Sequence, residues 1–142
     1  MDVAVPTNLE QIPELATAFG LTPHIQSRFT QLSLGQQNRA NLTRYLLQDI
    51  DLLIMDESLA NVDEATREKI ILTIKENFPD KCFLYISHNL MEVARFCRDI
   101  LVLRGPGKTP PVAKAHGYDQ TRRASPATGD LEPIMLEIVH AS

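Results

Sequence analysis

Apolar runs and helical patterns alternate through the middle of the chain, and this alternation predicts the fold. Leu52–Met55 is an unbroken apolar run, which is typical of a strand buried on both faces of a parallel sheet. A helix is expected over 63–78, a second strand over 81–86, a short helix after Asn89 and a third strand over 100–103. This order predicts a parallel α/β layout with right-handed crossovers.

The segments on either side of this pattern differ in character. The first 31 residues are predicted to form short helices and turns. An amphipathic helix is predicted over 35–48, with Ser33 as its N-cap. Residues 105–142 are rich in turn-forming residues, and 131–139 are expected to form a last helix.

Composition narrows the class of protein. The chain has 142 residues, of which 44% are hydrophobic and 23% charged, as expected for one soluble globular domain. Its net charge of −4 provides no electrostatic footprint for nucleic acid. Cys82 and Cys97 match no metal-binding spacing and are expected to be reduced thiols. Met1–Pro6 does not resemble a signal peptide, and no apolar stretch approaches the roughly 20 residues of a membrane helix. We expect a cytoplasmic protein that reaches a membrane only through a partner.

Two places along the chain carry candidate chemistry. The helix that begins at Ser33 and Gly35 has free amides and a positive dipole end that favour an anion, although most such helix starts are only caps. Asp56 and Glu57 directly follow the first predicted strand, at the sheet edge where open α/β folds bind ligands. On this stretch alone they could equally be solvated loop residues. His88 follows the second strand at the same edge, and this favours a site.

Four short motifs resemble those of ATP-binding-cassette (ABC) ATPases, in the same order along the chain. Residues 32–36, Leu-Ser-Leu-Gly-Gln, resemble the signature motif LSGGQ, with Arg39 in its usual following place. Leu52–Glu57 resembles the Walker B strand with its catalytic glutamate. Ser58–Asp63 resembles the D-loop, and Ser87-His88 the switch or H-loop. Together the four motifs are a far more specific signal than any one of them.

The resemblance implies a role for each matching residue. Asp56 would hold Mg²⁺, mostly through water, and Glu57 would orient or deprotonate the attacking water. His88 would contact the γ-phosphate of ATP. Other residues would act across a dimer interface, on nucleotide held by an opposing subunit: Ser33, Gly35, Gln36 and Asp63.

Two departures from the family pattern are small. Leu34 replaces the first glycine of the signature motif, and we expect this to be tolerated because the Ser33 hydroxyl and the Gly35 amide remain. Ser58 stands where many members have proline, which changes only the stiffness of the loop.

The largest departure is a missing Walker A loop, whose amides and lysine cradle the phosphates. Gly107-Lys108-Thr109 lacks the upstream glycine, is followed by prolines that exclude a helix, and lies after Walker B. The Q-loop is missing too. The chain therefore resembles the C-terminal portion of a P-loop-NTPase-type ABC domain. Residues 1–48 would be part of the helical subdomain with the signature helix, 49–104 the α/β portion with Walker B, D-loop and H-loop, and 105–142 a turn-rich tail.

Three functional hypotheses follow from this resemblance. The first is a portion of an ABC transporter ATPase that uses ATP and Mg²⁺, needs a Walker A loop from another chain, and works at the inner face of a membrane. Its partners would be a second ABC chain or a complementary N-terminal half, and a membrane permease subunit. The second is a non-catalytic module that docks on a complete ABC ATPase. A DNA-maintenance relative is less favoured, because the residues before the signature are too few for a coiled coil. We expect an oligomer, and negligible ATPase activity for the isolated chain.

Overall fold

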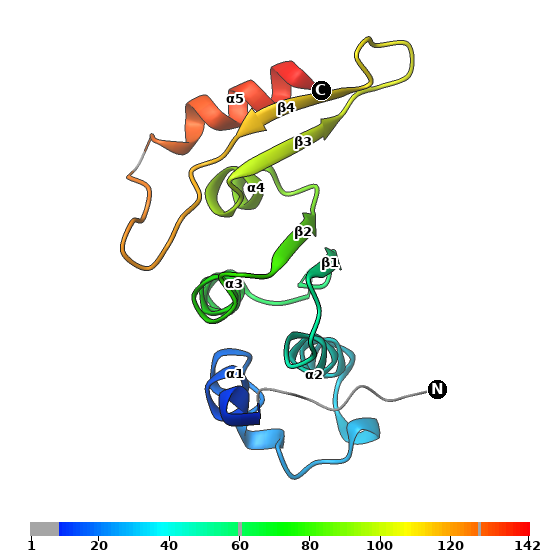
Figure 1. Ribbon diagram of the computed structural model, residues 1–142, viewed down its shortest axis with the longest axis vertical. Coiled ribbons are helices and arrows are strands. Elements are labelled where there is room, and N and C mark those ends of the chain that lie inside the picture. Colours follow the sequence, from blue (N-terminus) through cyan, green and yellow to red (C-terminus); the bar gives the residue numbers. More distant parts are fainter. Residues whose placement is uncertain (1–8, 60, 128) are drawn as a thin grey trace. The chain divides into compact units, whose positions relative to one another are not determined.

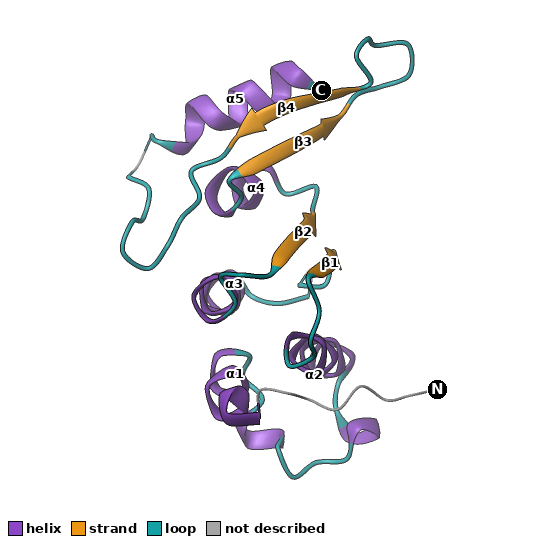
Figure 2. Ribbon diagram, in the orientation of Figure 1, coloured by secondary structure: helices purple, strands orange, loops and turns teal. Residues whose placement is uncertain are grey.

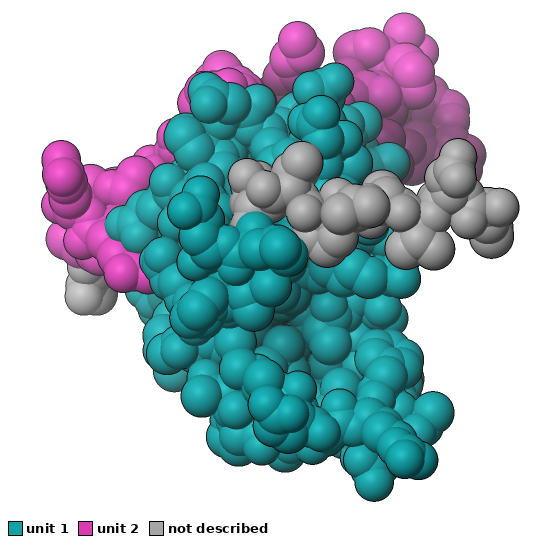
Figure 3. All heavy atoms as spheres, turned by 60° about the horizontal axis from the view of Figure 1, so that its bottom comes forward, with its two compact units in different colours: residues 1–86 teal, residues 87–142 magenta. Residues whose placement is uncertain are grey.

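The computed structural model describes residues 9–59, 61–127 and 129–142. Met1–Pro6 lies outside the described residues, so the prediction about a signal peptide is not tested by the structure. The chain divides into two compact units, which we call unit 1, up to Ile86, and unit 2, Ser87–Ser142 (Figure 3). The three-part division at residues 48 and 104 stays a prediction. No helix in the described residues is long and apolar enough to cross a membrane.

Unit 1 combines short helices with a pair of strands (Figure 1). Its strands lie side by side, one before and one after the longest helix of the described chain, α3 (Figure 2). Its elements in chain order are η1 (Leu9–Gln11), α1 (Ile12–Ala18), η2 (Thr22–His24), η3 (Phe29–Gln31), α2 (Leu34–Leu46), β1 (Leu52–Asp56), α3 (Glu64–Asn77) and β2 (Cys82–Ile86).

Local sequence signals explain where these helices begin and end. Ser33 caps α2 and Asp63 caps α3, in both cases by accepting a hydrogen bond from an amide three residues ahead, and this confirms both predicted caps. Pro13 lies in the first turn of α1, where its missing N–H is not needed. Gly20, just after α1, has a φ of +65°, a conformation that favours glycine.

The strands β1 and β2 pair in parallel, as predicted, with Leu52 opposite Cys82 and Asp56 opposite Ile86. The prediction that β1 is buried on both faces is wrong, however. Its burial alternates: Leu53 and Met55 are buried, whereas Leu52 and Ile54 are 52% and 57% exposed. Nothing in the described part of unit 1 covers this second face, so the apolar run has one side that its own unit leaves open.

The core of unit 1 forms where its helices meet. Helix α1 contacts both α2 and α3, and α3 buries five consecutive residues from Ile70 to Ile74. The most deeply buried large apolar side chains of this unit are Leu15, Phe19, Leu46, Leu59, Ile70 and Ile74. Leu59 places the loop after β1 in this core, which anchors the segment between the strand and α3.

Unit 2 contains α4 (Leu90–Phe96), β3 (Asp99–Leu103), β4 (Val112–His116) and α5 (Leu131–Ala141). Strand β3 pairs antiparallel with β4, with Asp99 opposite His116 and Leu103 opposite Val112. The prediction of a third parallel strand is therefore wrong in its pairing. The turn-rich segment after β3 reverses the chain, and Arg104 donates its amide to the Pro111 carbonyl at 3.0 Å, so the nearest partner of β3 is the strand that follows it.

Residues 105–142 hold more regular structure than predicted. The last helix is confirmed as α5, whereas β4 was not foreseen. The core of unit 2 forms between this hairpin and helices α4 and α5, from the buried residues Ala94, Ile100, Val102, Ala115 and Ile138. The Gly107-Lys108-Thr109 segment lies in the connection between β3 and β4 and is followed by a strand, not by the helix that a Walker A loop requires.

Candidate functional site

The start of α2 is closed by a reciprocal pair of hydrogen bonds. The Ser33 hydroxyl accepts from the Gln36 amide at 3.3 Å, and the Gln36 side-chain oxygen accepts from the Ser33 amide at 2.8 Å. Because the hydroxyl accepts here, its own proton is still available to an anion. The amides of Leu34 and Gly35, in the first turn, have no acceptor within the helix. The geometry therefore suits an anion at the predicted Ser33–Gly35 position.

Gln36 is more occupied than its predicted role suggests. Its side-chain nitrogen lies 2.8 Å from the His24 ring nitrogen, so both ends of the side chain have partners inside unit 1. A histidine eight residues before the signature motif carries no sequence signal that would link the two.

The signature motif and the D-loop are neighbours in unit 1. A Cβ built on Gly35 would lie 4.0 Å from the Asn61 carbonyl oxygen and 3.7 Å from a terminal nitrogen of Arg39. These are ordinary van der Waals distances, so the first turn of α2 lies beside the loop that contains Asn61, and the space there would also accept a methyl group. Arg39 also has its Nε buried without a hydrogen-bond partner. Two of the predicted motifs thus meet, although the rest of α2 and the whole of β1 separate them in sequence.

Asp63 closes the D-loop by capping α3. Its side chain accepts from the Thr66 amide at 2.9 Å. Hydrogen bonds from Thr66 hold the pKa of the Asp63 carboxyl below its ordinary value of 3.8, and the positive charge of Arg39 acts in the same direction. Asp63 is therefore ionised at neutral pH, at the end of the loop that approaches the signature helix.

Asp56 and Glu57 lie where β1 ends. Asp56 is the last residue of the strand and is exposed, and Glu57 donates its amide to the Ile86 carbonyl at 3.1 Å, which extends the pairing with β2 by one residue. Glu57 has a φ of +45°, a left-handed conformation that costs a non-glycine residue about 1 kcal/mol or more. Such strain gathers at functional sites, and here it turns the chain sharply from the strand into the D-loop.

His88 belongs to unit 2, two residues after the end of β2. It is exposed and precedes Asn89, which caps α4 and donates its amide to the Ser87 hydroxyl at 3.1 Å. Its predicted meeting with Asp56 and Glu57 stays a prediction.

The donor set suits a magnesium ion that binds mainly through water and phosphate. Among the described residues, no cluster of three or more His, Cys, Asp or Glu side chains could enclose a metal. Mg²⁺ does not need such a cage, because it keeps several waters and is usually held by one or two carboxylates together with substrate phosphates. Asp56, with Glu57 next to it, provides that kind of ligand.

Solved structures share the fold of this chain. An ABC transporter in an inward-facing conformation matches 96% of this chain and 53% of its own, with a TM-score of 0.55 and 16% identity. An ATP-binding cassette of another ABC transporter matches 97% of this chain and 53% of its own, with a TM-score of 0.58 and 20% identity. The chain has the α/β fold of an ABC ATPase, over about half of those structures.

Sequence relatives identify the family. An ABC transporter ATP-binding protein of Haemophilus influenzae is 33% identical over 97 residues, which are 68% of this chain and 40% of the relative. The molybdenum import ATP-binding protein ModC of Mesorhizobium japonicum is 38% identical over 59% of this chain and 23% of its own length. The zinc transport system ATP-binding protein TroB of Treponema pallidum is 36% identical over 59% and 32%. No protein-family model matches the chain.

The chain belongs to the family of ABC transporter ATP-binding proteins and corresponds to part of their ATP-binding domain. It spans less than half of the length of each of these three relatives.

Proposed function

We propose that this chain is a portion of an ABC transporter ATPase that hydrolyses ATP together with a Walker A loop supplied by another chain. One observation carries the proposal: unit 1 packs the start of the signature helix against the D-loop, with Gly35 beside the Asn61 carbonyl. This approach gathers the anion-binding amides of α2 and the ionised Asp63 loop in one region of the unit. Their proximity supports the proposal that this surface contacts a nucleotide bound by another chain.

Asp56 would bind the metal ion of the site, and Glu57 would act on the attacking water. When bound, Mg²⁺ neutralises charge on the phosphates of ATP. Asp56 would hold this ion through water, since its carboxylate stands exposed at the end of β1. Glu57, which follows the strand in a left-handed backbone conformation, would orient or deprotonate the attacking water. His88 would steady the same water and the γ-phosphate.

The signature motif would serve a second nucleotide, across an interface between subunits. The Ser33 hydroxyl proton and the Gly35 amide are donors that suit phosphate oxygens. Gln36 would act mainly by holding the first turn of α2, since its side chain already binds Ser33 and His24. Asp63 would act across the same interface. A membrane permease subunit would bring the assembly to the inner face of the membrane.

A non-catalytic docking module is the second candidate function. The open apolar face of β1 and β2 suits docking on another chain, and it fits this candidate as well as the catalytic one. In this case the chain would present its signature motif to a complete ABC ATPase and leave Asp56 and Glu57 unused.

Titration with ATP and Mg²⁺ separates the two candidates. The chain is titrated alone and then mixed with a segment that carries a Walker A loop, and bound nucleotide is measured by equilibrium dialysis. The proposal expects negligible binding alone and saturable binding in the mixture, which Asp56→Ala weakens by about tenfold or more. Binding in the mixture that does not depend on Asp56 would favour the docking module.

A further inference from the structure

The His24 ring ends a chain of hydrogen bonds that reaches Ser33 at the start of α2. The Gln36 carboxamide is its middle member: the oxygen accepts from the Ser33 amide at 2.8 Å, and the nitrogen lies 2.8 Å from Nε2 of His24. The Ser33 amide can only donate, so the carboxamide oxygen must point toward it and the carboxamide nitrogen toward the ring. Nε2 of His24 therefore accepts this hydrogen bond and carries no proton of its own.

The backbone of η2 holds the ring in place. Leu21, just before η2, is buried and donates its amide to the Ala16 carbonyl at 2.7 Å, which fixes η2 to α1. The His24 amide donates to the Leu21 carbonyl at 2.8 Å, and the His24 carbonyl accepts from the Ser27 amide at 2.9 Å. The acceptor that meets the signature helix thus belongs to a well-bonded turn, and its side chain is half-buried.

The charged side chains on the surrounding elements have other positions or partners. Within the described residues, the His24 ring is in no ion pair. On α1, Glu14 is exposed and accepts a hydrogen bond from a side chain of α3. Arg28 is exposed in the segment after η2, and Arg39 turns a terminal nitrogen toward the first turn of α2. The group that the ring nitrogen meets is the neutral Gln36 carboxamide.

Protonation of the ring would remove this acceptor. Histidine ordinarily changes charge between about pH 5 and 8, and its protonated ring has two donors and no acceptor. Two donors would then face each other between His24 and Gln36, so the carboxamide would turn away and the Ser33 amide would lose its acceptor. The reciprocal pair of hydrogen bonds at the start of α2 would keep only the bond from the Gln36 amide to the Ser33 hydroxyl.

We propose that His24 is a positioning residue for the first turn of α2, which its neutral ring holds and its protonated ring releases. The ring acts through the Gln36 carboxamide, which fixes the Ser33 amide. The Ser33 hydroxyl and the Gly35 amide are thereby held in place for phosphate oxygens. The role toward phosphate rests on the proposed function, whereas the hydrogen-bonded chain does not.

Protonation has two opposite effects on a bound anion, and uncharged variants separate them. Loss of the hydrogen bond loosens the turn, whereas the new positive charge attracts phosphate. His24→Phe removes the acceptor without adding a charge. His24→Gln keeps an acceptor, its carboxamide oxygen, that does not titrate. His140→Phe, at an exposed histidine of unit 2, is the matched control, and circular dichroism establishes that all three variants fold.

NMR of the full chain tests the hydrogen bonds without nucleotide. At about pH 8 the His24 ring should carry its proton on Nδ1 and none on Nε2. As the pH falls to about 5, the Ser33 amide and Gln36 carboxamide resonances should shift together with those of the ring. These shifts should be absent from His24→Gln and present in His140→Phe. A proton on Nε2 at about pH 8, or Ser33 and Gln36 resonances that do not follow the ring, would overturn the proposal.

ATP binding by the mixture with a Walker A segment tests the effect on phosphate. It is measured at about pH 8, where histidine is ordinarily neutral. His24→Phe should weaken binding by about three- to tenfold, the effect of one hydrogen bond, whereas His24→Gln and His140→Phe should leave it unchanged. Equal binding by His24→Phe and the wild type would overturn the proposal. Absence of ATP binding in every mixture would instead contradict the proposed function, and the NMR experiment would still decide whether His24 holds Gln36.

Discussion

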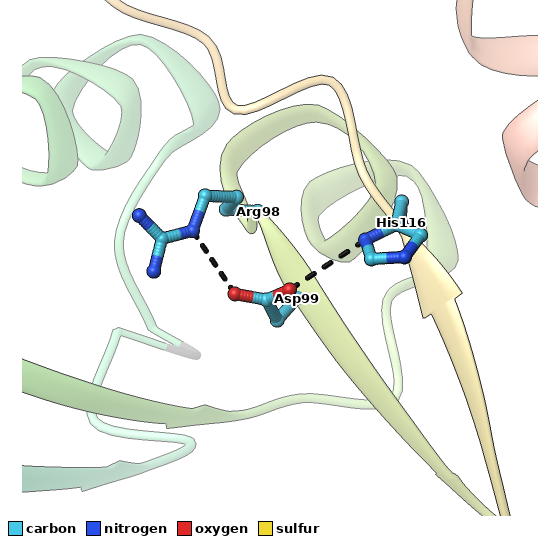
Figure 4. Close-up of polar contacts among 3 residues, drawn as sticks. All are labelled: Arg98, Asp99 and His116. Atoms are coloured by element: carbon cyan, nitrogen blue, oxygen red, sulfur yellow. Dashed lines mark hydrogen bonds and ion pairs between the residues drawn. The ribbon is translucent and has the colours of Figure 1, made fainter.

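Each of the two sheets has two strands, and alternate residues of its strands face the core of their own unit. The outer face, which points away from that core, differs between the two sheets. The outer face of β1 and β2 is apolar until Asp56 at its end; its exposed side chains are Leu52, Ile54, Cys82, Leu84 and Ile86. The outer face of β3 and β4 mixes Leu101 and Leu103 with charged and polar side chains. Asp99 there bonds to Arg98 at 3.0 Å and pairs with His116 at 3.5 Å (Figure 4).

This difference follows from the direction of the strands. Parallel sheets are normally covered on both faces, whereas an antiparallel sheet tolerates water on one side. The apolar outer face of β1 and β2 therefore belongs to a sheet that needs a further segment to cover it. Among the described residues, no third strand pairs with either edge of this sheet. The hairpin of unit 2 presents polar groups where it meets solvent. The predicted metal and base residues sit on the sheet that needs completion.

A large effect on association is expected where a charge is placed on the outer face of β1. Ile54→Glu should leave the chain folded, because this side chain is 57% exposed, but should weaken association with a Walker A segment by roughly a hundredfold, since it buries an unpaired charge. Leu101→Glu is the matched control on the other sheet. Sedimentation of the mixtures measures the association, and equal losses for the two variants would remove the distinction between the faces.

Truncation of a core residue should cost more than truncation of an outer-face residue. Ile70 is fully buried in α3, so Ile70→Ala should lower the free energy of unfolding by about 2–5 kcal/mol. Leu101→Ala, at a residue that is 58% exposed, should change it by no more than about 0.5 kcal/mol. Urea unfolding followed by circular dichroism measures both. A cost for Leu101→Ala close to that of Ile70→Ala would mean that the outer face of β3 is covered.

The D-loop cap should make stability depend on pH in the acid range. The pKa of Asp63 is lowered in the folded chain, so its contribution is present above the ordinary value of 3.8 and is lost as the pH falls through the lowered folded value. The variant Asp63→Asn keeps a side chain that can cap α3 but removes the charge, so this part of the pH dependence should disappear. Thermal unfolding from about pH 2 to about pH 6, the range in which carboxyl groups titrate, measures it. An unchanged pH profile in the variant would show that the cap carries no such linkage.

The smallest effect is expected at the ion pairs on the outer face of β3 and β4. The Arg98 side chain lowers the pKa of Asp99 by hydrogen bonding, but Arg98, Asp99 and His116 are all exposed, so solvent screens the interaction. Asp99→Asn should leave the unfolding temperature unchanged within error. A clear loss of stability would indicate that this face is more buried than that of an isolated hairpin.

Much of the fold could be predicted because local signals were strong. Ser33 and Asp63 stand directly before amphipathic helices, and the apolar runs of β1 and β2 are bounded by polar residues. Strand β4 was missed because Val112–His116 is short, contains two small alanines, and follows a proline-rich turn. The predicted parallel pairing of β3 was wrong. The order of elements favours a parallel sheet, but the turn after β3 brings β4 beside it as an antiparallel partner.

The assignment of the site residues stays a prediction, and their contacts could not be predicted from the sequence. Motif order pointed to Asp56, Glu57 and Gly35, and the strained backbone of Glu57 and the position of Asp56 at the strand end agree with that choice. The approach of Gly35 to Asn61 and the bond between Gln36 and His24 depend on how α2 packs, which no local pattern encodes. The open face of β1 likewise became visible only in three dimensions, because an apolar run does not tell which of its sides this chain covers.

ATP hydrolysis by a reconstituted pair tests the central claim most directly. The chain is mixed with a segment that carries a Walker A loop, and phosphate release is measured for the wild type and for Glu57→Gln, with the chain alone as reference. The account predicts negligible turnover alone, and turnover in the mixture that Glu57→Gln lowers by about a hundredfold or more. Robust turnover by the chain alone, or turnover in the mixture that survives Glu57→Gln, would contradict it.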